Sequence, residues 1–225
     1  MAQLAESGAP VVPLSEVTAT PGSFALTFDD GFENFIEHAL PVLEQYRFPA
    51  TVFVISAYCG RRNDWASQPQ NIPRLPLMSW TNLRSLSREL IQIGAHSVTH
   101  PDLTRISCLE VETELRQSKL QIEDQIGAPV QTLAYPYGTS SARIRTIAAD
   151  EFRLACGTRM GFVGGTSDVF NLPRVDAYYL QYFMGPDTLL TRSGRFYINL
   201  RAALREMRSR STRQTHRYLG PLQKT

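Results

Sequence analysis

The chain has 225 residues, of which 43% are hydrophobic and 20% are charged. This composition excludes a largely disordered chain and is typical of one large or two small globular domains. No stretch approaches the roughly 18–20 apolar residues of a membrane-spanning helix. The first ten residues lack the basic and apolar regions of a signal peptide, and the three cysteines have no metal-type spacing. We therefore expect a cytoplasmic protein with reduced thiols.

The net charge of +2 is unevenly distributed along the chain. Residues 192–225 contain nine Lys/Arg and one acid, Glu206, whereas residues 1–191 hold the other 14 basic and 20 acidic residues. The basic C-terminal helix could contact an anionic membrane or a membrane-linked glycan, and a solvated helix face is the simpler alternative. A basic-aromatic platform is missing, so nucleic acid is not an expected partner.

Apolar periodicity predicts strands that alternate with helices along most of the chain. Strands are predicted over 24–29, 50–56, 93–98, 130–135, 152–156 and 172–179, and helices over 33–46, 81–92, 107–126, 141–150 and 195–209. This alternation implies a parallel sheet with right-handed crossovers. Polar groups at the predicted strand ends favour a single α/β domain, built as a distorted or incomplete (β/α) barrel. A doubly wound open sheet is the alternative.

Two adjacent acids, Asp29 and Asp30, end the first predicted strand and precede Gly31. Close carboxylates repel each other, and the pKa of one rises unless a cation lies nearby. A metal bound to one carboxylate would be such a cation, and the other carboxylate could then take a proton from water. An ordinary Asp-Asp-Gly turn is the alternative explanation for this pair.

Two of the four histidines, His96 and His100, lie four residues apart. Pro101 disfavours a helix at His100, and the β-branched residues between the histidines favour an extended strand that runs into a loop. Imidazole nitrogens placed there suit a divalent metal such as zinc. A third ligand from the Asp29–Asp30 pair would leave a coordination position open for water.

The sequences T-F-D-D-G at 27–31, H-S-V-T-H at 96–100 and Y-P-Y-G at 135–138 resemble the motifs of the polysaccharide deacetylase family, in the family's order. The resemblance implies a distorted (β/α) barrel and metal-dependent hydrolysis of an N-acetyl group. The substrate would be an amino-sugar-containing glycan or glycan precursor, and acetate would be released. We accordingly assign the catalytic domain to 21–210, an N-terminal extension to 1–20 and a basic, flexible tail to 211–225.

The resemblance also implies roles for individual residues. Asp29 would be the catalytic base, and Asp30, His96 and His100 would bind a divalent metal. Zinc is the first expectation for this metal, with cobalt, nickel or manganese as alternatives. The backbone N–H near Tyr137 could donate to the oxyanion, and the Tyr137 side chain could form a wall of the substrate site.

The chain departs from the family pattern in two places. Ala134 stands where the third motif usually has an arginine that orients the base, and Arg174, in L-P-R-V-D, could supply that cation from a later strand. An ordinary surface arginine is the alternative. The family's last motif carries a histidine that protonates the leaving amine, but only His216 follows His100. The general acid is therefore unassigned, with Asp64, Asp168 or water at the metal as candidates.

Trp65, in an irregular segment over 57–78, could stack on a sugar ring because flat apolar sugar faces suit an indole. Two alternative functions also remain open. One is a metal-independent hydrolase of cyclic amides or imides on the same type of barrel. The other is a catalytically inactive module that binds glycans.

Overall fold

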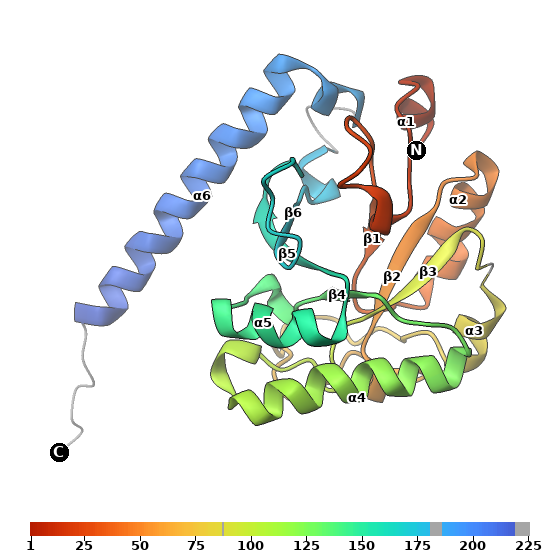
Figure 1. The fold of residues 1–225 in the computed structure, drawn as a ribbon, viewed down its shortest axis with the longest axis vertical. Helices are drawn as coiled ribbons and strands as arrows, with labels where there is room; N and C mark the ends of the chain where they lie inside the picture. Colours follow the sequence, from red (N-terminus) through yellow and green to blue (C-terminus); the bar gives the residue numbers. More distant parts are fainter. Residues whose placement is uncertain (87, 181–185, 219–225) are drawn as a thin grey trace.

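The computed structural model describes residues 1–86, 88–180 and 186–218. Its strands form one six-stranded parallel sheet with the order β1-β2-β3-β4-β5-β6 (Figure 1). The strands are Leu26–Phe28 (β1), Ala50–Val54 (β2), Ile91–Ala95 (β3), Thr132–Ala134 (β4), Leu154–Met160 (β5) and Leu172–Arg174 (β6). Because the spatial order follows the chain order without a reversal, the sheet is a curled, incomplete (β/α) barrel and not a doubly wound sheet.

Helices follow most of the strands and pack on the outside of the sheet (Figure 1). The α-helices are Ala2–Glu6 (α1), Leu40–Tyr46 (α2), Trp80–Ser85 (α3), Cys108–Ile126 (α4), Ala142–Glu151 (α5) and Arg192–Tyr218 (α6). Single 3₁₀ turns occur at Leu14–Glu16, Ser56–Tyr58, Leu103–Arg105, Pro136–Gly138, Ala177–Leu180 and Pro186–Leu190. Within the described residues, none of these helices is long and apolar enough to cross a membrane.

The longest helix over the sheet, α4, shows how local sequence sets an element's bounds. Ser107 is its N-cap, and a capping box joins the Ser107 and Glu110 side chains to each other's backbone N–H groups. Gly127 ends the helix in the left-handed conformation, with φ of 64°. Leu115 and Ile122, seven residues apart, point into the core with no exposed surface.

Several predicted elements differ in extent from the observed ones, among them the strand predicted over 93–98, which is β3, and the helix predicted over 195–209, which is α6. The helix predicted over 33–46 is a π-helical turn at Phe35–Ala39 followed by α2, because Pro41 has no N–H and is tolerated only near a helix start. The helix predicted over 81–92 ends at Ser85, since the chain must become extended to enter β3 at Ile91. The strand predicted over 172–179 ends at Arg174.

The core has an outer part between the sheet and the helices and an inner part within the curl. The strand β2 is buried along its whole length, as its continuous apolar run predicts. Inside the curl, Phe53, Cys156 and Leu172 pack together with Leu14, which comes from the predicted N-terminal extension. The domain boundaries remain a prediction. Residues 211–218 continue α6, and residues 219–225 lie outside the described residues.

We expect Gly94→Ala to destabilise the fold, because β3 passes close to inner side chains at this residue. A Cβ at Gly94 would lie 2.5 Å from the Phe53 ring and 2.7 Å from Thr132 Oγ1. Overpacking of this kind lowers the free energy of unfolding by about 1–3 kcal/mol. Chemical denaturation measures the loss. Gly164→Ala is the matched control, since no atom lies within 4 Å of its Cβ position. Equal stability of the two variants would contradict the prediction.

Candidate functional site

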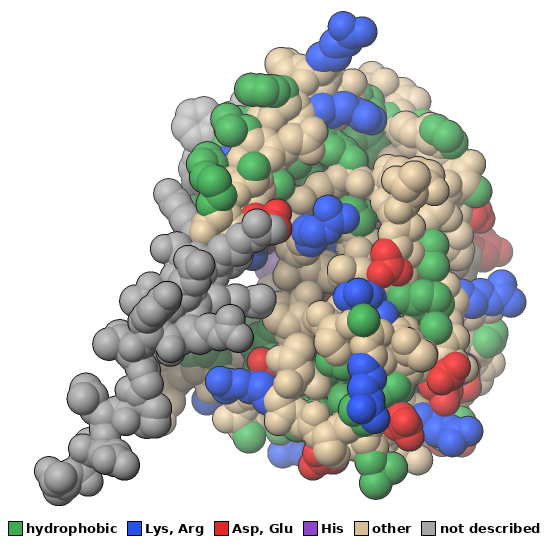
Figure 2. Space-filling model, turned by 60° about the vertical axis from the view of Figure 1, so that its left-hand side comes forward, with side chains coloured by type: hydrophobic (Ala, Val, Ile, Leu, Met, Phe, Trp, Pro, Cys, Tyr) green, Lys and Arg blue, Asp and Glu red, His purple; other side chains and the backbone are tan. Residues whose placement is uncertain are grey.

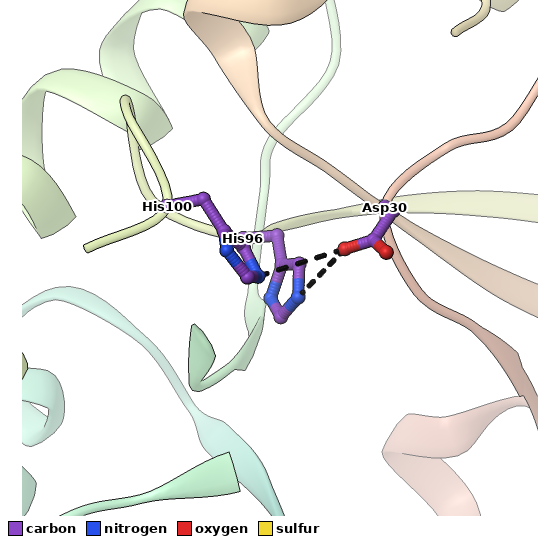
Figure 3. A group of neighbouring side chains, drawn as sticks. All are labelled: Asp30, His96 and His100. Carbon is purple, nitrogen blue, oxygen red and sulfur yellow. Dashed lines mark ion pairs between the residues drawn. The ribbon is translucent and has the colours of Figure 1, made fainter. Parts of the chain in front are cut away.

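The predicted site residues meet at the carboxyl edge of the sheet. Asp29 and Asp30 directly follow β1, and His96 directly follows β3, with His100 in the loop beyond it. The carboxyl ends of parallel strands share one edge of a sheet, so residues distant in sequence become neighbours there. In Figure 3 the side chains of Asp30, His96 and His100 point toward one another from separate segments.

Asp30, His96 and His100 form a compact set of one oxygen and two nitrogen donors. The Asp30 Oδ1 atom lies 3.3 Å from His96 Nε2 and 3.6 Å from His100 Nε2. Ligand atoms of the three side chains all lie within 4.8 Å of one another. Both imidazoles are buried, and the aspartate is partly exposed. This donor set is the type that binds zinc and similar divalent ions at catalytic sites.

A backbone hydrogen bond directs the Nε2 atom of His96 toward Asp30. The Nδ1 atom of His96 lies 2.7 Å from the backbone oxygen of Ala134, so Nδ1 carries the proton that it donates there. Burial lowers the pKa of His96, but the hydrogen bond to Asp30 and the charge of Asp29 outweigh it, and the net direction is upward. Burial and the neighbouring His96 lower the pKa of His100 to about 3. A bound cation would replace the proton that His96 otherwise shares with Asp30.

Left-handed backbone conformations are concentrated at this site. Among the described non-glycine residues, φ is positive at Asp30 (68°), Ser97 (67°), His100 (58°) and Tyr137 (58°), and elsewhere only at Arg47 (52°). Such conformations are unfavourable for residues with a Cβ and persist where the surrounding structure fixes them. Four of these five residues lie in the three motif segments 27–31, 96–100 and 135–138. The backbone is therefore held in an unfavourable conformation where it orients these side chains.

Arg174, at the end of β6, forms a bidentate ion pair with Asp29. Its two terminal nitrogens each lie 2.7 Å from one carboxylate oxygen, and its Nε donates to the Gly157 oxygen at 2.9 Å. Burial would raise the pKa of Asp29, but the charge and hydrogen bonds of Arg174 outweigh it, so the pKa lies below its ordinary value. Arg174 thus occupies the role of a cation beside the first aspartate, although Ala134 replaces the usual arginine.

The loop after β3 is fixed by Glu114, a residue that sequence reasoning did not identify. One Glu114 oxygen accepts the backbone N–H groups of Val98 and Thr99 at 2.8 and 2.9 Å, and the other accepts the Thr99 hydroxyl at 2.7 Å. These bonds satisfy the backbone between the two histidines. Glu114 is one of several acids on α4, so only the packing of this helix against the loop distinguishes it.

Trp65 and Tyr137 enclose His100 from two sides. Each ring centroid lies 4.6 Å from that of His100. Tyr137 is 41% exposed, and its hydroxyl donates to Ser67 Oγ at 2.7 Å, which in turn donates to the His100 oxygen at 3.0 Å. Trp65 is only 2% exposed. Stacking of Trp65 on a sugar would require an accessible ring face. In the structure the buried Trp65 ring instead packs against His100.

Among the candidate general acids whose side chains are described, neither Asp64 nor Asp168 lies at the site. Asp168 pairs with Arg145 of α5 at 3.0 Å and accepts the Phe170 N–H. Asp64 is exposed on the 57–78 segment. His216 lies in the last part of α6, where the side chains are outside the described residues.

We expect Glu114→Ala to weaken binding of a divalent metal by roughly 10- to 100-fold, as loss of a residue that orients ligands does. Without Glu114, the Val98 and Thr99 N–H groups lose their acceptor, and His100 is no longer held in its left-handed conformation. Zinc and cobalt titration by calorimetry measures the effect. Glu112→Ala, an exposed position on the same helix, is the control. If both variants bind metal like wild type, Glu114 does not orient the histidine loop.

Comparison with known proteins adds independent information. The family model for polysaccharide deacetylase matches residues 16–151, more than half of the chain. A chitooligosaccharide deacetylase of Sinorhizobium fredii is 32% identical over 135 residues, which cover 59% of this chain and 54% of that protein. A gellan lyase of a Bacillus species is 30% identical over 138 residues, 61% of this chain but 5% of the relative. The chain thus spans about half of one relative and a small part of the other.

The fold has a similar counterpart among solved structures. The deacetylase PplD of Streptococcus pyogenes superposes with a TM-score of 0.66 and 24% identity over 77% of each chain. This likeness supports the curled parallel barrel. The family match ends before β5 and β6, so the position of Arg174 is outside it. With the barrel and the three motifs in place, the matched residues show that the chain belongs to the polysaccharide deacetylase family.

Proposed function

We propose that this chain is a metal-dependent amide hydrolase that removes the N-acetyl group from an amino sugar of a glycan or glycan precursor. The observation that carries the proposal is the Asp30, His96 and His100 donor set with the Arg174-paired Asp29 beside it. Membership of the polysaccharide deacetylase family supports this proposal. So does the similarity to a chitooligosaccharide deacetylase, of which the match covers about half the length.

The donor set fits a divalent metal on the chemistry of its atoms. Asp30, His96 and His100 would hold the ion, and the Ala134 oxygen fixes the tautomer of His96. Zinc is our first choice because two imidazoles and one carboxylate are a common catalytic zinc set, and cobalt, nickel or manganese are alternatives. When bound, the ion would supply positive charge to the acetamide carbonyl and lower the pKa of a water molecule.

Asp29 serves as the base in this proposal. The lowered pKa keeps its carboxylate ionised, so that it can accept a proton from the attacking water. Arg174 uses one lone pair of each carboxylate oxygen and leaves the other free for that proton. The pair also fixes the orientation of the carboxylate, and orientation contributes strongly to proton transfer.

Three further tasks are to stabilise the oxyanion, to contact the sugar and to protonate the leaving amine. The backbone N–H of Tyr137 is the second oxyanion donor in our proposal, and the partly exposed Tyr137 ring forms a wall of the sugar site. As water adds to the carbonyl carbon and the C–N bond breaks, the amine nitrogen needs a proton. Protonated Asp29 is a strong acid beside Arg174, so it can return the proton that it took.

We expect Asp29→Asn to lower kcat/KM for acetate release from N-acetylated chitooligosaccharides by about 10²- to 10⁴-fold, the usual contribution of a positioned base. The variant should keep its metal, because Asp30, His96 and His100 are unchanged. Acetate assays combined with metal analysis of the purified protein measure both quantities. Asp30→Asn is the companion variant and should lose metal and activity together. Turnover near wild type in Asp29→Asn would show that the two aspartates are wrongly assigned.

We also expect Arg174→Gln to shift the acidic limb of the kcat/KM profile to higher pH. Asp29 acts when ionised, and Arg174 keeps it ionised as the pH falls. Without the guanidinium, burial dominates, the pKa of Asp29 rises, and activity is lost at a higher pH. At neutral pH, kcat/KM should fall by roughly 10²-fold because the carboxylate loses its orientation.

Two variants complete this experiment. Arg174→Lys keeps the charge but not the bidentate geometry, so its acidic limb should lie closer to that of wild type than the limb of Arg174→Gln does. Arg159→Gln removes an exposed charge from the neighbouring strand and should leave the profile unchanged. If the acidic limb of Arg174→Gln lies at the same pH as that of wild type, Arg174 does not set the pKa of Asp29.

The alternative functions have different outcomes in the same assays. A hydrolase of cyclic amides or imides that does not use the histidines would stay active after His96→Ala and chelation. A catalytically inactive glycan-binding module would bind N-acetylated oligosaccharides and release no acetate with zinc, cobalt, nickel or manganese. The missing family histidine makes this module the second candidate. Cytoplasmic location also remains a prediction, which detection of the native protein outside the cell would overturn.

A further inference from the structure

The helix α6 exposes an apolar stripe along the face that is turned away from the barrel. Its members are spaced four, four and three residues apart and so share one helix face. They are Phe196 (69% exposed), Leu200 (47%), Leu204 (44%) and Met207 (61%). Figure 1 shows α6 running away from the body of the molecule, and in Figure 2 hydrophobic side chains follow one another along the upper left toward the grey atoms.

The stripe is a second apolar face, because another face of α6 already packs on the barrel. Ile198 is fully buried against Met160 and Leu189. The Arg195 guanidinium lies 5.1 Å from the Phe162 ring centroid. The core contact therefore anchors the first turns of the helix and leaves the stripe available. Large contiguous apolar patches on a soluble domain commonly mark an interaction site.

Positive charge accompanies the stripe. Four arginines of α6 in the part with described side chains are exposed, namely Arg192, Arg195, Arg201 and Arg205. Arg195 stacks on Phe162, and the Arg201 Nε donates to the Tyr197 hydroxyl at 2.8 Å, which leaves Arg192 and Arg205 as the better candidates for contacts outside the chain. Over residues 192–225 the sequence has nine basic residues and one acid, a net charge of +8, against −6 for residues 1–191. A helix that combines an apolar stripe with arginines is the kind that lies in the interface of an anionic membrane.

We propose that α6 docks this domain on an anionic lipid surface, with the stripe inserted at the level of the headgroups and the arginines against lipid phosphates. The net charge of +8 over residues 192–225 disfavours a second copy as the occupant, because pairing of two such segments would bring like charges together. Nucleic acid as the occupant would bind the basic side chains but would leave the apolar stripe exposed to water. The acidic remainder of the chain would be repelled by the same surface, which orients the domain.

Vesicle co-sedimentation of the full chain tests this proposal. The probes are vesicles of phosphatidylcholine alone and vesicles with about 30% phosphatidylglycerol, and binding should occur chiefly to the second kind and fall with added salt. Phe196→Ser with Leu200→Ser should lower the partition coefficient at least tenfold. Arg192→Gln with Arg205→Gln should lower it on the order of twentyfold, since each basic residue near such a surface contributes about fivefold.

Matched controls change the same chemistry elsewhere on the surface. Leu109→Ser with Leu120→Ser alters two exposed leucines of α4, and Arg143→Gln with Arg153→Gln removes two exposed charges. Both control pairs should bind anionic vesicles like wild type. Equal binding to neutral and anionic vesicles would overturn the proposal, as would losses in the controls equal to those in α6. Analytical ultracentrifugation showing a dimer that Phe196→Ser with Leu200→Ser dissociates would assign the stripe to a second copy.

Discussion

Two carboxylates and two imidazoles are brought together at one edge of the sheet, and the rest of the site depends on how their charges are balanced. Buried charges are costly unless they are paired and hydrogen-bonded. Arg174 balances Asp29 directly. Asp30 lies against His96 and His100, whose pKa values are driven in opposite directions by that proximity and by burial. This imbalance, with one acid oxygen facing two imidazole nitrogens, is what makes the set suited to a divalent cation.

The barrel supplies rigid positions for these groups, and the connecting segments supply unusual backbone shapes. The strands β1 and β3 end at the same edge, which brings Asp30 and His96 close without any local motif joining them. The positive φ angles at Ser97 and His100 persist because Glu114 and Ser67 bond the backbone of this loop. Rigid strands and a fixed loop together preorganise the site before any ligand binds.

Much of this was predictable from the sequence because it depends on local patterns. The apolar run of β2 and the caps at Ser107 and Gly127 determine their elements within a few residues. The acidic and histidine motifs single out the two aspartates and two histidines, and the family resemblance implies which aspartate would be the ligand. By contrast, Glu114 could not be found, since its partners are set by the packing of α4. The burial of Trp65 likewise depends on how a long irregular segment folds over His100, which no periodicity encodes.

The contact between Arg174 and Asp29 joins residues 145 positions apart, and this distance has a consequence for the chain as it is synthesised. The ribosome delivers Asp30, His96 and His100 well before β6, so these three neighbouring side chains are all synthesised early. Asp29 receives its partner only when nearly the whole barrel has emerged. In the proposed mechanism, where Asp29 is the base, the chain therefore gains an oriented base only with the completion of the sheet.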